Sequence, residues 1–361
     1  MTQTRRTFVG TLAAAPLLPA APQKKKRILI LGGTGFLGPA TVEAAVARGH
    51  ELTLFNRGKT RPGLFPNIET LNGDRDPDKG EGLNALRNRK WDAVIDNSGF
   101  YPRQVSASAK LLAPNVGQYI YISSISAYAD NSIEGQDETG KLADTSKIDP
   151  TVEKMSNEAY GPLKVLCEQA SEAAMPRRTT IVRPGYIVGP DDPSGRFTYW
   201  PVRFDRGGEV LVPGEPSDPV QIIDVRDLGA WLITLVEQNT IGAFNAAGPK
   251  DRLAWGDLIQ ACRKATKTEH SVTWVDGVWV RKKADEYFPI WAPYSGETRG
   301  FHMWKNTRAV KAGLKSRPYS ETVADTLKWY KSQPENGRTK LAGPAPEKEA
   351  QLLAAWKKSR G

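Results

Sequence analysis

Tyr160 and Lys164 are the first residues in this sequence whose types and spacing suggest chemistry. They are four residues apart in a segment with helical character, so their side chains should share one helix face. A phenol beside an ammonium ion has a lowered pKa, and such a tyrosine can act as a general acid or base. Because pairs with this spacing also arise by chance, Tyr160 and Lys164 gain weight only from the motifs that precede them.

A serine-rich run, 123–126, directly follows the apolar stretch Gln118–Ile122. If that stretch is a central strand of a parallel sheet, the serines lie at the crevice where ligands bind. The same serines would equally suit a cap for the next segment. The run alone therefore leaves both roles open.

A glycine-rich turn lies between the apolar segment Ile28–Leu31 and a helical segment over about 36–48. Its Gly32, Gly35 and Gly38 are three residues apart, and such glycines permit a tight turn, close approach of a phosphate and close helix–strand packing. The helix N-terminus that follows attracts a pyrophosphate. Glycine turns also serve ordinary packing, but the flanking strand and helix favour a dinucleotide-binding site.

Apolar strands alternate with helical stretches between residues 27 and 183. The expected strands are Ile28–Leu31, Glu51–Phe55, Ile68–Leu71, Asp92–Ile95, Gln118–Ile122 and Thr179–Val182, with helices such as Gly82–Arg89 and Arg103–Ala113 between them. This alternation predicts an α/β fold with a doubly wound parallel (Rossmann) sheet, covered by helices on both faces. Ligands of such a sheet bind at the carboxyl ends of its strands.

The residues after the second and third strands bear on the choice of cofactor. The segment 56–59, which begins Asn56-Arg57, has no acidic residue for an adenosine ribose, and Arg57 could pair with a 2′-phosphate. This favours NADP, with NAD as the alternative, although Arg57 also suits a solvated turn. Asp74, followed by Arg75, could accept a hydrogen bond from the adenine amino group or could simply cap a turn.

Together these motifs resemble the extended short-chain dehydrogenase/reductase superfamily, and most closely its NAD-dependent epimerase/dehydratase-like branch. The resemblance runs from about residue 27 to 227 and implies that Ser124, four residues before Tyr128, is catalytic with Tyr160 and Lys164. Tyr160 would exchange a proton with a substrate hydroxyl or carbonyl while the nicotinamide exchanges a hydride. Lys164 would lower the pKa of Tyr160 and hold the nicotinamide ribose, and Ser124 would hydrogen-bond the reacting oxygen.

The resemblance also implies a set of cofactor-binding residues. They are Gly32, Gly35, Phe36, Leu37, Gly38, Asn56, Arg57, Asp74, Arg75, Tyr160, Lys164 and Pro184. Pro184 belongs to a segment, 183–190, that resembles the family's path beside the nicotinamide and into a substrate domain. No metal is expected.

The residues after Ser124 narrow the implied reaction. Sugar-nucleotide 4,6-dehydratases carry an acidic pair where Ile125 and Ser126 stand here, which argues against dehydration. We therefore expect an oxidoreductase or epimerase that acts on a sugar-like alcohol or ketone. The alternative is a cofactor-binding scaffold, or an RNA-binding relative of the same fold, without turnover.

Aromatic and basic residues beyond position 190 are candidates for substrate contacts. The tryptophans could stack on a sugar or pack a core; they are Trp200, Trp274, Trp279, Trp291 and Trp304. Arg196 and Arg203 could bind an anionic substrate group or be ordinary surface charges.

The N-terminus, residues 1–23, resembles a twin-arginine (Tat) export signal. Arg5 and Arg6 precede an apolar run, Leu12–Leu18, and small residues near Ala21 suit cleavage. We expect export to the periplasm or the extracellular space, with a disordered tail as the alternative. Export would argue against a nucleotide-sugar substrate, because those donors are cytoplasmic.

The rest of the chain divides by composition. The expected units are a cofactor domain over 24–190 and about 220–250, a smaller substrate domain over 191–219 and 251–330, and a tail with a short helix over 331–361. No apolar run is long enough for a membrane span. Cys167 and Cys262 are too few for a disulfide framework.

The net charge of +10 is spread along the chain. With no basic stripe interleaved with aromatics, no nucleic-acid partner is expected. Dimers are usual in the resembled family, so a homodimer is one expected state.

Overall fold

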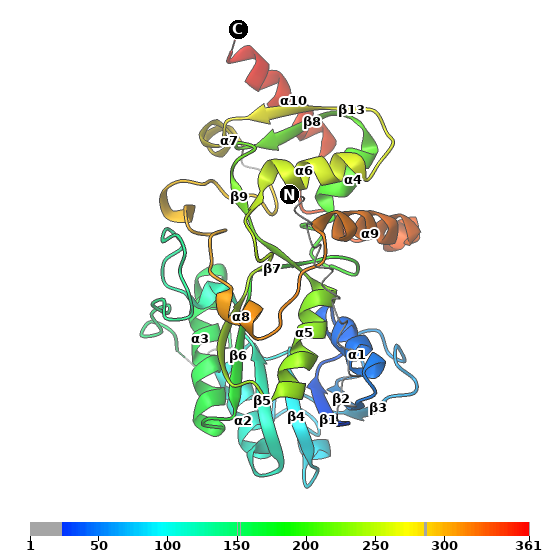
Figure 1. The fold of residues 1–361 in the computed structure, drawn as a ribbon, viewed down its shortest axis with the longest axis vertical. Coiled ribbons are helices and arrows are strands. Elements are labelled where there is room, and N and C mark those ends of the chain that lie inside the picture. Colours follow the sequence, from blue (N-terminus) through cyan, green and yellow to red (C-terminus); the bar gives the residue numbers. More distant parts are fainter. Residues whose placement is uncertain (1–23, 150, 152, 285–286, 361) are drawn as a thin grey trace, which may run out of the picture.

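The computed structural model describes residues 24–149, 151, 153–284 and 287–360, so the expected export signal lies outside the described residues. Its main sheet is parallel, with strand order β11-β6-β5-β4-β1-β2-β3 (Figure 1). The strands are β1 (Arg27–Leu31), β2 (Glu51–Asn56), β3 (Glu69–Asn72), β4 (Trp91–Asp96), β5 (Val116–Ile122), β6 (Thr179–Pro184) and β11 (Gly242–Ala246). The doubly wound α/β sheet is thereby confirmed.

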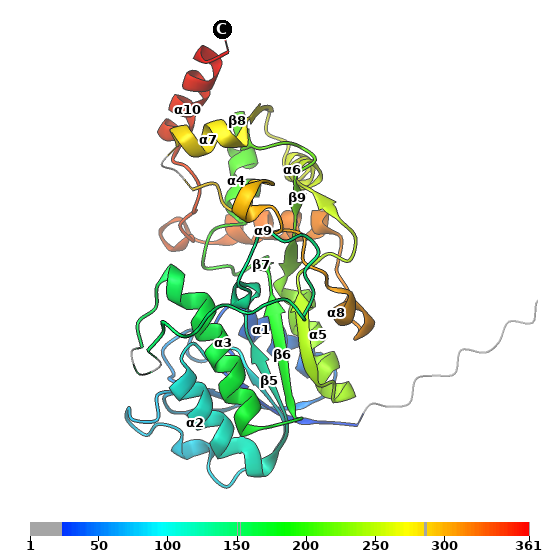
Figure 2. The same cartoon turned by 90° about the vertical axis from the view of Figure 1, so that its left-hand side faces the viewer.

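Both faces of the sheet are buried, and β1 shows how one strand serves two cores. Ile28 and Ile30 pack in one core with helices α1 (Leu37–Ala47) and α5 (Val225–Gln238). The alternate residues Leu29 and Leu31 pack in the other, with α2 (Pro102–Leu112) and α3 (Asn157–Ala174). Because successive side chains point to opposite faces, an all-apolar strand indicates burial on both sides. Figure 2 shows the two helical layers flanking the sheet.

The helix expected over Gly82–Arg89 is wrong. The chain between β3 and β4 forms turns and one short 3₁₀ segment, Asn84–Leu86. Gly80 and Gly82 have φ values of +54° and +49°, in the left-handed region, which a right-handed helix cannot include. The apolar residues Leu83 and Leu86 contact the sheet from this irregular link.

A second core lies beyond the carboxyl ends of the strands, at the top of Figure 1. It contains a parallel pair of strands, β8 (Gly208–Pro213) and β13 (His270–Val275). The helices around it are α4 (Tyr199–Arg206), α6 (Trp255–Lys264), α7 (Gly277–Lys283), α9 (Tyr319–Ser332) and α10 (Pro346–Lys358). The expected C-terminal helix is α10, and its Leu352 and Leu353 join this core.

Short elements connect the two regions. Strand β7 (Tyr186–Val188) pairs with β10 (Ile222–Asp224), and β9 (Pro219–Val220) pairs with β12 (Leu253–Ala254). Helix α8 (Thr307–Lys311) returns beside β11. Since β7 directly follows β6, the segment that crosses into the second region starts at the carboxyl edge of the sheet. Among the described residues, no helix combines the length and apolar character of a membrane span.

Candidate active site

The glycine turn leaves an open space in front of helix α1. A Cβ atom on Gly38 would overlap the backbone of Gly33, so Gly38 lets α1 pack against the turn. A Cβ atom on Gly35 would have no neighbour within 4 Å. Helix α1 starts without a side-chain cap or an acidic residue in its first turn, so its N-terminal N–H groups are available to an anion. These observations fit a bound pyrophosphate.

Arg61 holds the turn in this shape, and the sequence analysis missed it. Its guanidinium donates hydrogen bonds to the carbonyl oxygens of Thr34 (3.0 Å) and Gly35 (2.7 Å) and pairs with Asp191 (2.7 Å). Arg61 therefore ties the turn to the segment that leads into the second region. Its partners are 26 to 130 residues away in sequence, so no local pattern could have indicated this role.

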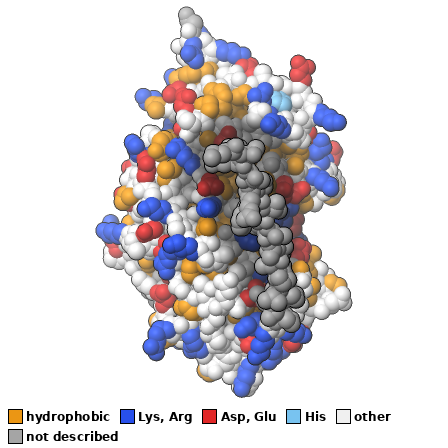
Figure 3. All heavy atoms as spheres, viewed as in Figure 1, with side chains coloured by type: hydrophobic (Ala, Val, Ile, Leu, Met, Phe, Trp, Pro, Cys, Tyr) orange, Lys and Arg blue, Asp and Glu red, His pale blue; other side chains and the backbone are white. Residues whose placement is uncertain are grey.

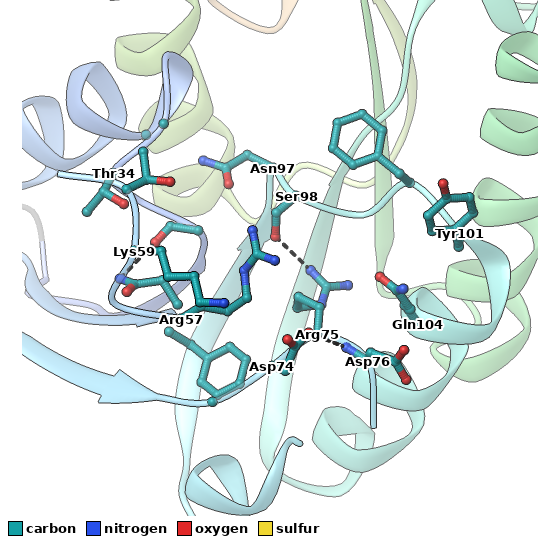
Figure 4. Close-up of a pocket in the computed structure, with 18 of the residues that line it drawn as sticks. Thr34, Arg57, Lys59, Asp74, Arg75, Asp76, Asn97, Ser98, Tyr101 and Gln104 are labelled. Carbon is teal, nitrogen blue, oxygen red and sulfur yellow. Dashed lines mark hydrogen bonds between the residues drawn. The ribbon is translucent and has the colours of Figure 1, made fainter. Parts of the chain in front are cut away.

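A cavity of about 860 Å³ lies in front of the turn at the carboxyl ends of β1, β2 and β4 (Figure 4). Most of the expected cofactor residues line it, namely Gly32, Gly35, Phe36, Leu37, Gly38, Asn56, Arg57, Asp74 and Arg75. Arg57 and Lys59 are exposed there and have no hydrogen-bond or ion-pair partner among the described residues. Asn56 accepts a hydrogen bond from the Gly58 amide (2.8 Å) and so shapes the turn that carries both cations.

Arg75 and Asp74 lie at this cavity in different roles. The Arg75 guanidinium is bound to Asp96 (2.5 and 2.8 Å), Ser98 (3.1 Å) and Ser108, so it mainly braces the cavity. Although burial opposes ionisation of Asp96, Arg75 holds the pKa of that carboxyl below its usual value. Asp74 accepts a hydrogen bond from the Asp76 amide (3.0 Å), which is the turn role.

A second cavity, of about 400 Å³, adjoins the first and shares Phe36, Leu37, Asn97 and Phe100 with it. The structure brings the expected Ser124, Tyr160, Lys164 and Pro184 together in its lining. Two distant segments of the chain complete the lining with Tyr186, Arg196 and Phe301.

Tight packing sets Tyr160 beside the serine run. A Cβ atom on Gly161 would overlap the carbonyl oxygen of Ser126, so the glycine lets α3 approach that segment. Ser124 accepts a hydrogen bond from the Ser126 amide (3.1 Å), which is the capping role left open by the sequence. Ser124 thus caps the turn and lines the cavity at the same time.

A buried polar network supports the serine run from behind. Ser123 donates to Glu168 (2.5 Å), which pairs with Arg183 (2.7 Å). Arg183 in turn donates to the hydroxyl of Tyr128 (2.9 Å), and Tyr128 stacks on Trp304 with ring centroids 4.6 Å apart. Since every member has a partner, the network holds the end of β5 rigidly.

Lys164 is almost completely buried and fully hydrogen-bonded. Its Nζ donates to the carbonyl oxygens of Ile122 (2.8 Å) and Gly99 (3.1 Å) and to the hydroxyl of Tyr121 (3.1 Å). Burial lowers the pKa of Lys164 to about 8. Its ammonium therefore braces the loop after β4 against β5.

The expected lowering of the Tyr160 pKa by Lys164 is wrong. Burial raises the pKa of Tyr160 above its usual value, and hydrogen bonding with Ser124 and the charge of Arg196 only partly oppose this. Lys164 shares a helix face with Tyr160, but its Nζ is directed to the backbone of β5 and of the loop after β4 instead. The cation that acts on Tyr160 comes from another segment of the chain.

The tryptophans and Arg203 do not contribute to this cavity. Its aromatic lining consists of Phe36, Phe100, Tyr160, Tyr186 and Phe301, and none of the five candidate tryptophans is among the lining residues. Trp200 is fully buried and donates to the Pro289 carbonyl (2.7 Å), as expected of a core residue. Arg203 is a buried partner of Glu349.

The strand order and the overall fold match those of solved epimerases, some of them in complex with NAD. A putative epimerase from Burkholderia cenocepacia superposes with a TM-score of 0.63 at 19% identity, covering 85% of this chain and 98% of that one. A Bordetella bronchiseptica enzyme in complex with NAD⁺ gives 0.62 at 18%, covering 86% and 99%. UDP-glucuronic acid 4-epimerase from Bacillus cereus, in complex with NAD, gives 0.59 at 14%, covering 84% and 98%.

Comparison with curated sequences finds relatives with several different functions in their names. No protein-family model matches the chain. A chloroplast stem-loop binding protein of 41 kDa from Arabidopsis thaliana is 27% identical over 267 residues, which is 69% of this chain and 65% of that protein. An epimerase family protein of Bos taurus is 26% identical over 247 residues, covering 65% and 79%. A putative dihydroflavonol 4-reductase from Synechocystis is 27% identical over 223 residues, covering 56% and 60%.

Proposed function

We propose that this protein is an NAD(P)-dependent oxidoreductase or epimerase that acts on a sugar-like alcohol or ketone. The observation that carries the proposal is the meeting of Ser124 and Tyr160 in a cavity that adjoins the glycine turn. The proposed proton-transfer group would therefore lie beside the proposed dinucleotide site. The epimerase and reductase names among the relatives support the same class.

The cofactor would lie along the two adjoining cavities. Gly35 and the N-terminus of α1 would hold its pyrophosphate, and Pro184 and Lys164 line the cavity proposed for its nicotinamide ribose. When bound, the cofactor supplies or accepts the hydride. We propose NADP, because Arg57 and Lys59 place unpaired positive charge at the adenosine end, with NAD as the alternative.

Tyr160 is the proposed proton donor and acceptor. Because its pKa is raised, the phenol is neutral near pH 7 and is ready to donate a proton to a carbonyl oxygen during reduction. In the opposite direction the phenolate form of Tyr160, which is left after the phenol has donated its proton, would take the proton of the substrate hydroxyl. Ser124 would hydrogen-bond the same oxygen and stabilise its developing charge.

A Tyr160→Phe protein tests the catalytic assignment. We expect the turnover of sugar alcohols or ketones to fall roughly 100-fold or more, because the proton-transfer group is lost while the ring remains. Cofactor affinity should stay within about twofold of the wild type, since the phenol oxygen is one contact among many. Tyr330→Phe, on helix α9, is the matched control.

Mass identification of any nucleotide released by denaturing the protein accompanies this test. Held NADP would support the role of Arg57, and tightly held NAD would favour epimerisation and contradict that role. Unchanged turnover by Tyr160→Phe would reject the catalytic proposal. Cofactor binding without any turnover by the wild type would favour a scaffold.

RNA binding is a second candidate, favoured by the stem-loop binding protein among the relatives and by the net charge of +10. Against it, Lys and Arg side chains alternate with Asp and Glu over the face drawn in Figure 3. Retention of an RNA stem-loop that weakens steeply with salt would support this candidate.

The location of the protein in the cell is a separate proposal. Residues 1–23 suggest export through the twin-arginine route, which favours a sugar that is not attached to a nucleotide. Fractionation of cells that express the full chain tests it. Retention in the cytoplasm would make nucleotide sugars the first candidates, as in the neighbour solved with UDP-glucose and NAD.

A further inference from the structure

The charged side chains that line the second cavity are all positive. Among the described residues that line it, Lys164 and Arg196 are the charged ones, and neither an aspartate nor a glutamate is present. The Lys164 ammonium has its three donors directed to protein acceptors. Arg196 therefore provides the positive charge that remains for a ligand.

The Arg196 guanidinium is held in a defined orientation. Its Cζ lies over the ring of Tyr186, 5.0 Å from the ring centroid, and its Nε donates to Ser194 Oγ (3.0 Å). Ser194 is itself fixed, because its hydroxyl and amide both donate to Asp192 Oδ1 (2.6 and 2.9 Å). Tyr186 in turn packs edge-on against Phe301, 5.7 Å away.

The two terminal nitrogens of the Arg196 guanidinium have no partner among the described residues. Its Nη1 and Nη2 have no hydrogen-bond acceptor and no ion-pair partner among the residues that the structure describes. A guanidinium is planar, so one that is fixed through Nε presents its remaining N–H groups in one plane, which suits two oxygens of an anion. Its charge also reaches Tyr160, so the anion and the reacting oxygen would lie within one small molecule.

We propose that Arg196 binds an oxyanion of the substrate, a carboxylate or a phosphate, and that the substrate class is therefore an acidic sugar or a sugar phosphate. This inference rests on the proposed function and specifies its substrate. A cavity of about 400 Å³ that also adjoins the cofactor site accommodates a compact molecule. Arg196 is a binding residue in this role, and Tyr160 keeps the proton transfer.

Titration calorimetry on the cofactor-loaded protein tests the proposal, with glucuronate, glucose 6-phosphate and glucose as probes. The three share a ring, so they isolate the carboxylate and the phosphate. We expect at least one anionic probe to bind more tightly than glucose, and Arg196→Gln to weaken that probe by about 10- to 100-fold without affecting glucose. The affinity of Arg196→Lys for the anionic probe should lie between those of the wild type and Arg196→Gln, because lysine keeps the charge and loses the planar pair of N–H donors. Arg281→Gln, on helix α7, removes a charge elsewhere and should match the wild type.

Preference for glucuronate would assign a carboxylate, and preference for glucose 6-phosphate would assign a phosphate. Equal binding of an anionic probe by the wild type and Arg196→Gln would overturn the proposal, and so would failure of both anions to bind. The proposed function fails separately, through loss of cofactor binding or unchanged turnover in Tyr160→Phe. Anion binding by Tyr160→Phe should remain dependent on Arg196.

Discussion

Lys164 shows at the residue scale how burial changes a side chain that the sequence marks for chemistry. It is 4% exposed, and its pKa of about 8 lies below that of a free lysine. Below pH 8 the folded and unfolded states are both protonated, so the cost of burying the ammonium is constant. Between about pH 8 and 10.4 the folded state loses the proton first, and stability gains relative to a chain without Lys164.

We therefore predict a pH-dependent difference between the wild type and Lys164→Met. The difference in free energy of unfolding should be flat up to about pH 7.5 and should then move in favour of the wild type by up to about 3 kcal/mol near pH 10. Urea unfolding at several pH values measures it. Lys358→Met, on exposed α10, is the control, and a flat difference across the whole range would refute the shift.

At the scale of elements, two glycines of the turn before helix α1 allow the effect on protein stability to be separated from the effect on cofactor affinity. A Cβ atom on Gly35 enters open space, whereas one on Gly38 overlaps the Gly33 backbone. Gly35→Ala should keep its free energy of unfolding within about 0.5 kcal/mol and lose cofactor affinity, because the methyl group would enter the space that we propose for a phosphate. Gly38→Ala should lose about 1–3 kcal/mol of stability as well.

Chemical denaturation and cofactor titration on the two variants check this pair. Normal cofactor affinity in Gly35→Ala would show that the phosphate does not approach that position. Full stability in Gly38→Ala would show that α1 can move away from the turn without cost.

On the scale of the whole molecule, Glu349 connects the C-terminal helix to the second core. Its carboxylate accepts hydrogen bonds from Arg203 (2.5 Å), Arg206 (2.9 Å) and the Leu211 amide (3.0 Å), and it is 2% exposed. Removal of one partner of a buried pair leaves the other charge unpaired. Glu349 thereby fixes helix α10 to helix α4 and strand β8 of the second core.

Glu349→Ala should accordingly lower the free energy of unfolding of the second region by about 3–5 kcal/mol. Cofactor binding should persist, because the glycine turn belongs to a different core. Glu347→Ala, exposed on the same helix, is the control for denaturation. Equal free energies of unfolding for Glu349→Ala and Glu347→Ala would exclude a structural role for the pair of Glu349 and Arg203.

The sequence by itself determined the Rossmann sheet and where its ligands must lie. The strands are continuous apolar runs, the glycine turn has a fixed spacing, and both are local signals that burial and backbone geometry impose. The position of the serine run after a central strand was enough to place it at the carboxyl edge of the sheet, whereas the choice of Ser124 with Tyr160 came from the family resemblance. The helix expected over Gly82–Arg89 is wrong, since Gly82 and Asn88 both adopt left-handed conformations there.

Only the tertiary structure decided which charges act on the site. Lys164 donates hydrogen bonds to backbone carbonyls, and Arg75 is paired with Asp96. Arg61 and Arg196 reach the two cavities from other segments of the chain. The partners of Lys164, Arg75 and Arg61 are at least 21 residues away in sequence, and contacts over such separations leave no periodicity in a sequence. Periodic burial therefore predicted the scaffold, while the electrostatics of the site came from the folded chain.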